Sequence, residues 1–172
     1  MPRNSNKVGP KGEARAKVIP RAKLASLGAK LRREGKRVVF TNGVFDLLHS
    51  GHVALLEAAK SLGDLLVVGI NSDGSVRRLS KGPGRPIVPA RDRAIVMAAL
   101  GCVDHVTIFG EETPLETIRR LKPDVLVKGS DWGAKAIVGS DDVRSWGGRV
   151  VRVKLKGGYS TTRIVERIRS QT

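Results

Sequence analysis

Short runs of β-branched residues and leucine alternate with segments of helical periodicity from residue 38 to the C-terminus. We expect strands at residues 38–41, 65–71, 105–109, 125–128 and 149–155, and helices at about 50–61, 74–79, 90–100, 114–121, 136–146 and 161–169. Strands separated by helices indicate βαβ units and a parallel sheet covered on both faces. The pattern therefore predicts a doubly wound α/β domain with a five-stranded parallel sheet, a Rossmann-like fold.

The segment before the first strand divides into two parts. Leu24, Leu27 and Leu31 recur at helical spacing and Gly35 supplies a stop, so we expect a lead-in helix over about 19–34. Residues 1–18 mix basic, small polar, glycine and proline residues without apolar periodicity, which is typical of a disordered segment. With 172 residues and 40% hydrophobic content, the chain is predicted to form a disordered basic tail at 1–18 and one domain at 19–172.

The charge is concentrated near the N-terminus. The chain has a formal net charge of +16, and residues 1–37 hold twelve of its 32 Lys and Arg but only two of its 16 Asp and Glu. A basic segment of this kind attracts nucleic acid without sequence specificity. Only 3% of the residues are aromatic, which leaves few stacking platforms, so no specific nucleic-acid partner is expected. No apolar run approaches the ~20 residues of a membrane span and no secretory signal is recognisable, so we expect a cytoplasmic protein without membrane contact.

The richest chemistry follows the first predicted strand, at residues 41–52. Gly43 allows a tight turn, and the backbone amides after it, with the start of the next helix, form a cradle for phosphate oxygens. His49 and His52 are three residues apart, so they lie on one face if both belong to the first helical turn, and Gly51 between them permits close approach of a ligand. Two imidazoles beside phosphate stabilise charge that develops during phosphoryl transfer. Polar residues at a helix start, or two zinc ligands, are the alternatives.

Three further turns at predicted strand ends carry candidate groups. The loop at 80–89 contains Lys81 and Arg85, two cations that can neutralise the charge of departing pyrophosphate. Arg77 and Arg78 are the rivals of Lys81 for the catalytic role. The alternative is a solvated basic loop without a catalytic role. The third turn contains the nucleotide-binding candidates Lys128, Gly129, Asp131 and Trp132, of which the last two suit ribose and base; Trp132 is otherwise structural. The fourth begins the last helix with Ser160, Thr161, Thr162 and Arg163, which suit an anion, although Ser160 is otherwise a simple cap.

Residues 41–52, with Asn-Gly-x-Phe-Asp before His-x-Gly-His, resemble the signature of the cytidylyltransferase-like nucleotidyltransferase superfamily. The resemblance implies that His49 and His52 bind the triphosphate and the transition state, and that Phe45 and Asp46 position nucleotide and acceptor. Core packing explains Phe45 equally well. The remaining nucleotide-binding positions that follow from it are Thr41, Asn42, Gly43 and Gly51, and the Ser-Thr-Thr turn at 160–162 resembles the second family signature. Asp46, Arg85 and Arg163 are the candidates for contact with the phosphorylated substrate.

Residues 72–87, together with 89–93 and 98–104, closely resemble one branch, the bacterial D-glycero-β-D-manno-heptose 1-phosphate adenylyltransferases. Ser80 interrupts the Leu-Lys-Gly that is usual in this branch, and Trp132 replaces its usual Tyr. Gly-x-Asp-Trp is also found in glycerol-3-phosphate cytidylyltransferases, which are the alternative within the family. A basic nucleic-acid-binding module on a degenerate nucleotidyltransferase fold is the alternative from another class.

The heptose branch implies an enzyme that transfers AMP from ATP to the heptose 1-phosphate, releasing pyrophosphate and forming ADP-heptose for lipopolysaccharide. Mg²⁺ is expected to arrive with ATP, and no metal site built by the protein is expected. In that branch the activity is often fused to a sugar kinase, so we expect a separate sugar kinase as pathway partner and, as in relatives, a homodimer.

Overall fold

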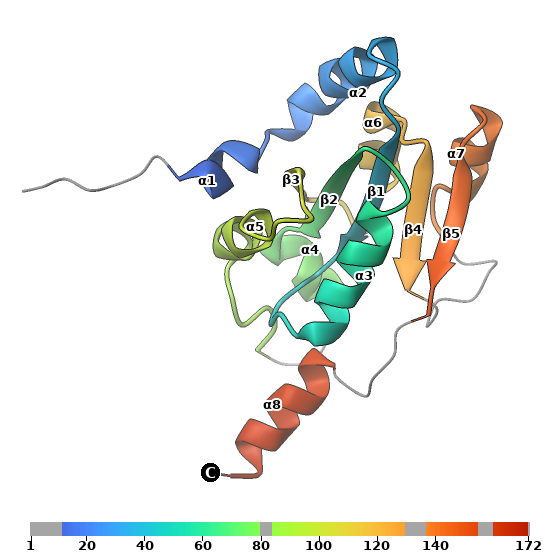
Figure 1. Cartoon of the computed structure of the whole chain (residues 1–172). Coiled ribbons are helices and arrows are strands. Elements are labelled where there is room, and N and C mark those ends of the chain that lie inside the picture. The colour runs from blue at the N-terminus through green and yellow to red at the C-terminus, as the bar shows by residue number, and fades with distance from the viewer. Residues whose placement is uncertain (1–11, 80–83, 130–136, 155–159, 172) are drawn as a thin grey trace, which may run out of the picture.

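A five-stranded, all-parallel sheet forms the centre of the protein. The computed structural model describes residues 12–79, 84–129, 137–154 and 160–171 (Figure 1). The strands are β1 (Val38–Gly43), β2 (Leu65–Asn71), β3 (His105–Phe109), β4 (Val125–Gly129) and β5 (Arg149–Val153), in the order β3-β2-β1-β4-β5. The helices are α1 (Glu13–Lys17), α2 (Leu24–Arg33), α3 (Ser50–Lys60), α4 (Asp73–Arg78), α5 (Ala90–Ala98), α6 (Leu115–Leu121), α7 (Ser140–Ser145) and α8 (Thr161–Arg169), and a 3₁₀ turn, η1 (Arg21–Lys23), precedes α2. The predicted fold class is confirmed.

Each face of the sheet has its own apolar core, because successive strand residues point to opposite faces. Val39 of β1 packs with Leu56 of α3 and Met97 of α5 on one face. Phe40 packs with Leu24 of α2 and Leu121 of α6 on the other. All six residues are fully buried. Burial on both faces explains why β1 and β2 appear in the sequence as continuous apolar runs rather than as alternating ones.

The N-terminal boundary predicted at residue 19 is wrong for the described residues 12–18. Residues 13–17 form α1, and Ala14 and Val18 pack against the core on the α3/α5 face. Val18 forms a parallel bridge with Val106, and Lys17 Nζ donates to the carbonyl of Val103 at 2.9 Å. The two apolar residues are four apart, which is helical spacing, but they stand among charged residues and their partners are distant in sequence.

The other predicted elements agree with the structure to within a few residues, apart from two helix starts. The lead-in helix predicted at about 19–34 is divided into η1 and α2, and α2 begins only at Leu24. The helix predicted at 136–146 begins only at Ser140, because Gly139 precedes it with a left-handed φ of 84°. A Cβ at Gly139 would lie 2.7 Å from Ile118 Cδ1, so glycine also permits close packing there.

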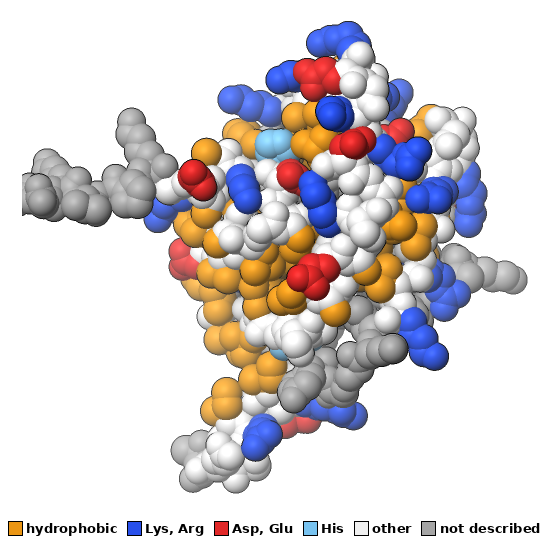
Figure 2. Space-filling view, in the orientation of Figure 1, with side chains coloured by type: hydrophobic (Ala, Val, Ile, Leu, Met, Phe, Trp, Pro, Cys, Tyr) orange, Lys and Arg blue, Asp and Glu red, His pale blue; other side chains and the backbone are white. Residues whose placement is uncertain are grey.

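The uneven distribution of basic residues along the sequence is also visible on the molecular surface. Basic side chains surround the end of the molecule that carries α2, with acidic side chains among them (Figure 2). Within the described residues, no helix is long and apolar enough to cross a bilayer.

Candidate functional site

The candidate site lies where β1 and β4 end side by side. The strand order reverses direction at this pair, which is where open α/β sheets bind ligands. Lys128, near the end of β4, is almost fully buried and donates from Nζ to the carbonyl of Asn42 on β1 at 3.2 Å. Two of the four predicted turns, after β1 and β4, therefore leave the sheet from adjacent strands.

Both histidines of the signature lie at the start of α3. His49 is the residue before the helix and has an extended backbone, and His52 lies in the first turn. Their rings stack with centroids 3.7 Å apart and an angle of 22° between planes. A Cβ on Gly51 would come within 3.1 Å of the His49 ring, so glycine gives this imidazole its room. Phe45 contacts His52 edge to face, with centroids 5.1 Å apart, and is itself buried.

Burial keeps the two imidazoles neutral. It lowers the pKa of His52 to about 4, with a smaller contribution from His49, and it also lowers the pKa of His49. Nδ1 of each ring is buried and has no hydrogen-bond partner in the described part of the chain. A neutral imidazole has one donor and one acceptor nitrogen, so each ring can donate one hydrogen bond to phosphate at neutral pH.

The turn between β1 and α3 presents a run of backbone N–H donors. Among the described residues, no acceptor pairs with the backbone N–H groups of residues 44–48. Phe45 has a φ of 49°, an uncommon left-handed conformation for a residue with a side chain. Unpaired amides at a turn leading into a helix of eleven residues are a typical cradle for an anion.

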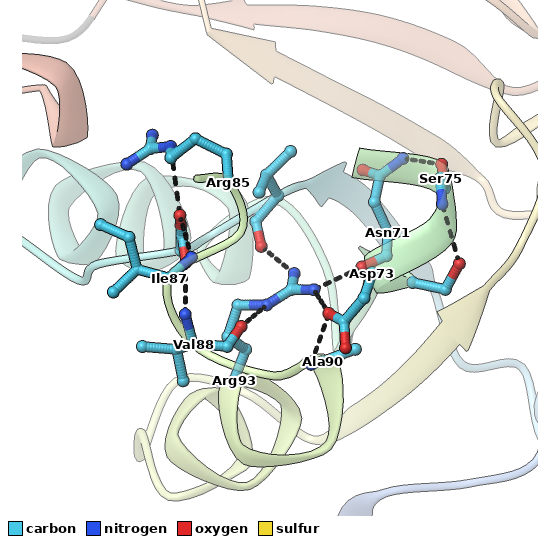
Figure 3. A network of polar contacts seen from close by, with 11 residues as sticks. Asn71, Asp73, Ser75, Arg85, Ile87, Val88, Ala90 and Arg93 are labelled. Atoms are coloured by element: carbon cyan, nitrogen blue, oxygen red, sulfur yellow. Dashed lines mark hydrogen bonds and ion pairs between the residues drawn. The ribbon is translucent and has the colours of Figure 1, made fainter. Parts of the chain in front are cut away.

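The carboxylate of Asp46 is bound by groups of the loop that precedes α5. It accepts hydrogen bonds from the backbone N–H groups of Ile87 and Val88, each at 2.9 Å, and pairs with Arg85 Nε at 3.2 Å (Figure 3). The Asp46 side chain is 1% exposed and that of Arg85 13%. The structure thus brings together two predicted substrate-binding residues, but it pairs them with each other.

Arg93 of α5 is a residue of this region to which the sequence analysis gave no role. Its guanidinium donates to the carbonyls of Val44, Asn71 and Val88 and pairs with Asp73 at 2.7 Å (Figure 3). No local signal distinguishes it from the nearby Arg91, which is exposed.

The start of α8 reaches the same turn. Ser160 caps the helix by accepting from the backbone N–H of Arg163 at 3.2 Å, which is the capping alternative considered above. Thr161 Oγ1 donates to the carbonyl of Leu47 at 3.4 Å, and so connects α8 to the turn between β1 and α3. Thr162 and Arg163 are exposed.

Of the other candidates, Thr41, Asn42 and Gly43 form the end of β1 and Gly129 ends β4, whereas Lys81, Asp131 and Trp132 lie outside the described residues. Among the rivals of Lys81, Arg77 is exposed, and Arg78 donates to the carbonyl of Gly110 and lies 3.7 Å from Glu112. In the described ranges no group of three or more His, Cys, Asp and Glu side chains is arranged to hold a metal, so His49 and His52 have no further zinc ligands there.

Comparison with known proteins identifies relatives along most of the chain. A bifunctional protein HldE from Syntrophotalea carbinolica is 58% identical over 80% of this chain, and one from Koribacter versatilis is 54% identical over 90%. These matches cover 28% and 32% of the relatives' own lengths, so the chain spans about a third of each.

Solved structures share the fold. A lipopolysaccharide core biosynthesis protein from Thermoplasma volcanium is 31% identical, with a TM-score of 0.60, over 73% of this chain and all of that one. A pantoate-β-alanine ligase from Francisella tularensis, 12% identical with a TM-score of 0.54, covers 88% of this chain and 76% of its own and shows a similarity of fold alone. The model of the cytidylyltransferase-like family matches residues 40–167, and the chain belongs to this family.

Proposed function

We propose that the protein is a nucleotidyltransferase that transfers AMP from ATP to D-glycero-β-D-manno-heptose 1-phosphate, forming ADP-heptose and pyrophosphate. The observation that carries this proposal is the stacked, neutral pair His49 and His52 beside backbone amides, after the end of β1, that have no acceptor among the described residues. The heptose is supported by the resemblance of segments within residues 72–104 and by relatives named bifunctional protein HldE and lipopolysaccharide core biosynthesis protein.

The reaction needs alignment and charge neutralisation more than covalent chemistry. An oxygen of the sugar phosphate attacks the α-phosphorus of ATP, the bond from that phosphorus to the bridging oxygen breaks, and pyrophosphate leaves in line. The amides of residues 44–48 hold phosphate oxygens, and the neutral imidazoles donate hydrogen bonds to charge that grows in the transition state. Neutral donors do not need a counter-ion before ATP arrives.

Mg²⁺ is proposed to enter with ATP, coordinated mainly by phosphate oxygens. The support for this proposal is the state of Asp46, whose carboxylate is already engaged by Arg85 and two backbone amides, which leaves the phosphate oxygens of ATP as the main ligands. When bound, Mg²⁺ withdraws charge from the leaving pyrophosphate.

The proposed reaction also implies partners. A sugar kinase activity must supply the anomeric phosphate of the acceptor, and we propose that such a kinase acts before this protein, in the cytoplasm, where ATP is available. We further propose that the protein works as a homodimer, which sedimentation of the purified chain tests directly.

The deciding experiment is pyrophosphate release with ATP, CTP, GTP or UTP as donor and heptose 1-phosphate or glycerol 3-phosphate as acceptor. We expect release with ATP and the heptose. Release with CTP and glycerol 3-phosphate would preserve the reaction class and overturn the substrate. No release from any pair, with folded protein and Mg²⁺ present, would overturn the proposed function.

A further inference from the structure

Arg93 connects three segments that are distant in sequence. Its side chain, 1% exposed, donates to the carbonyls of Val44 after β1, Asn71 at the end of β2 and Val88 before α5. The carboxylate of Asp73 lies 2.7 Å from it and also accepts from the backbone N–H of Ala90 at 2.8 Å. Figure 3 shows the guanidinium at the centre of this network.

One of these bonds fixes the turn that faces the proposed phosphate site. Arg93 holds the carbonyl of Val44, and a trans peptide group is planar, so the N–H of Phe45 is fixed in the opposite direction. The same bond helps to hold Phe45 in its left-handed conformation, with its ring edge to face against His52. Arg93 therefore acts on the amide of Phe45 and on the packing of a signature histidine, in both cases through the backbone of the turn.

A second set of bonds holds the loop before α5. The backbone N–H of Val88 donates to Asp46, and its carbonyl accepts from Arg93 Nε at 2.8 Å. Both polar backbone groups of Val88 are thus held from the turn between β1 and α3. Asp46 belongs to this turn, and Arg93 is bound to it through the carbonyl of Val44. This attaches the base of the loop, and with it Arg85, to the turn.

A lysine would not replace this arrangement. The guanidinium offers five donors in a planar fork and can serve three carbonyls and a carboxylate together, whereas an ammonium group has three donors around one atom. Arg93→Lys keeps the charge and the pair with Asp73 but not all of the carbonyl bonds. The substitution therefore separates positioning from charge.

We propose that Arg93 is a positioning residue for the transfer reaction: it holds the phosphate-facing turn at residues 44–46 and the base of the loop at 84–89 in one fixed arrangement. The proposal rests on the proposed function for its kinetic consequence. Its structural consequence, restraint of the loop base, is independent of the substrate.

The test compares Arg93→Lys with Arg91→Lys, the same substitution at an exposed position of α5. We expect Arg93→Lys to lower kcat by roughly 100-fold, with KM for ATP changed by about threefold or less, because a small displacement of aligned groups costs rate more than binding. Arg91→Lys should match the wild type. A purely structural Arg93 would lower the melting temperature but leave kcat per folded molecule unchanged, and kcat within threefold of Arg91→Lys would overturn the proposal.

A second measurement needs no substrate. Hydrogen exchange of the Ile87 and Val88 amides, which donate to Asp46, should be faster in Arg93→Lys than in Arg91→Lys. If the wild type releases no pyrophosphate, the proposed function fails, but the exchange measurement still tests the positioning role. Equal exchange rates in the two variants would overturn that role. If Arg93→Lys does not fold, Asp73→Asn takes its place, with kcat expected to fall by about tenfold; kcat equal to that of Arg91→Lys would then overturn the proposal.

Discussion

Replacing Asp46 with Ala removes a buried carboxylate that holds three groups. The backbone N–H groups of Ile87 and Val88 lose their acceptor, and the guanidinium of Arg85 loses its counter-ion. Arg85 already has one buried nitrogen, Nη1, without a hydrogen-bond partner among the described residues. The variant would thus leave a mostly buried cation and two amides to find water or move.

The expected loss of stability follows from this burial. Removing one partner of a buried ion pair costs about 3–5 kcal/mol, because the other charge is left uncompensated. For a domain of this size that corresponds to a fall in melting temperature of roughly 6–20 °C. Asp46→Asn, which keeps one acceptor oxygen, should lose about 2–3 kcal/mol, since hydrogen bonds to charged groups contribute about 1.5–3 kcal/mol each.

Urea unfolding at pH 7 measures the change, with Asp141→Ala as control. The Asp141 side chain is 97% exposed, and its pair with Arg144 at 3.4 Å should contribute about 0.5 kcal/mol or less. A double-mutant cycle with Arg85→Ala isolates the ion pair from the two amide bonds. If Asp46→Ala unfolds within about 1 kcal/mol of the wild type, water satisfies these groups and the reasoning from burial is refuted.

Three further predictions concern the histidines and the N-terminal segment. His52→Ala should lower turnover of the proposed reaction by roughly 100-fold with the fold intact; His105→Gln is the control, and near-normal activity of His52→Ala would contradict its role. The pKa of His52 lies at about 4 in the fold against an ordinary 6.5, so the unfolded chain binds more protons between these values and stability should fall as pH drops from about 6.5 to 4. After allowance for solvent screening, we expect this residue to account for a loss of about 1–2 kcal/mol in the free energy of unfolding over that pH range. If urea unfolding gave His52→Gln the same dependence of stability on pH as the wild type, this contribution of His52 would be excluded. Truncation through residue 18 should destabilise the protein by about 1–3 kcal/mol relative to truncation through residue 11, because it removes the packing of Ala14 and Val18; equal melting temperatures would show that α1 contributes nothing.

The sequence by itself determined the order of strands and helices and the chemistry of the turn after β1. The predicted strand at 105–109 and the helix at 161–169 match β3 and α8 because local apolar periodicity and flanking turn residues are sufficient to define them. The spacing of His49 and His52 likewise implied one shared face, and their rings stack in the fold.

Only the tertiary structure decided what the charged residues of this region contact. Asp46 meets Ile87 across 41 positions of sequence, and Arg93 meets Val44 across 49. Residue type and spacing carry no record of partners so far apart, so buried Arg93 and exposed Arg91 appear equivalent in the sequence. The same reason explains the error at α1, whose two apolar residues acquire meaning only through contact with the core on the α3/α5 face. Periodicity determines local structure, whereas burial and ion pairing depend on which distant segments the sheet brings together.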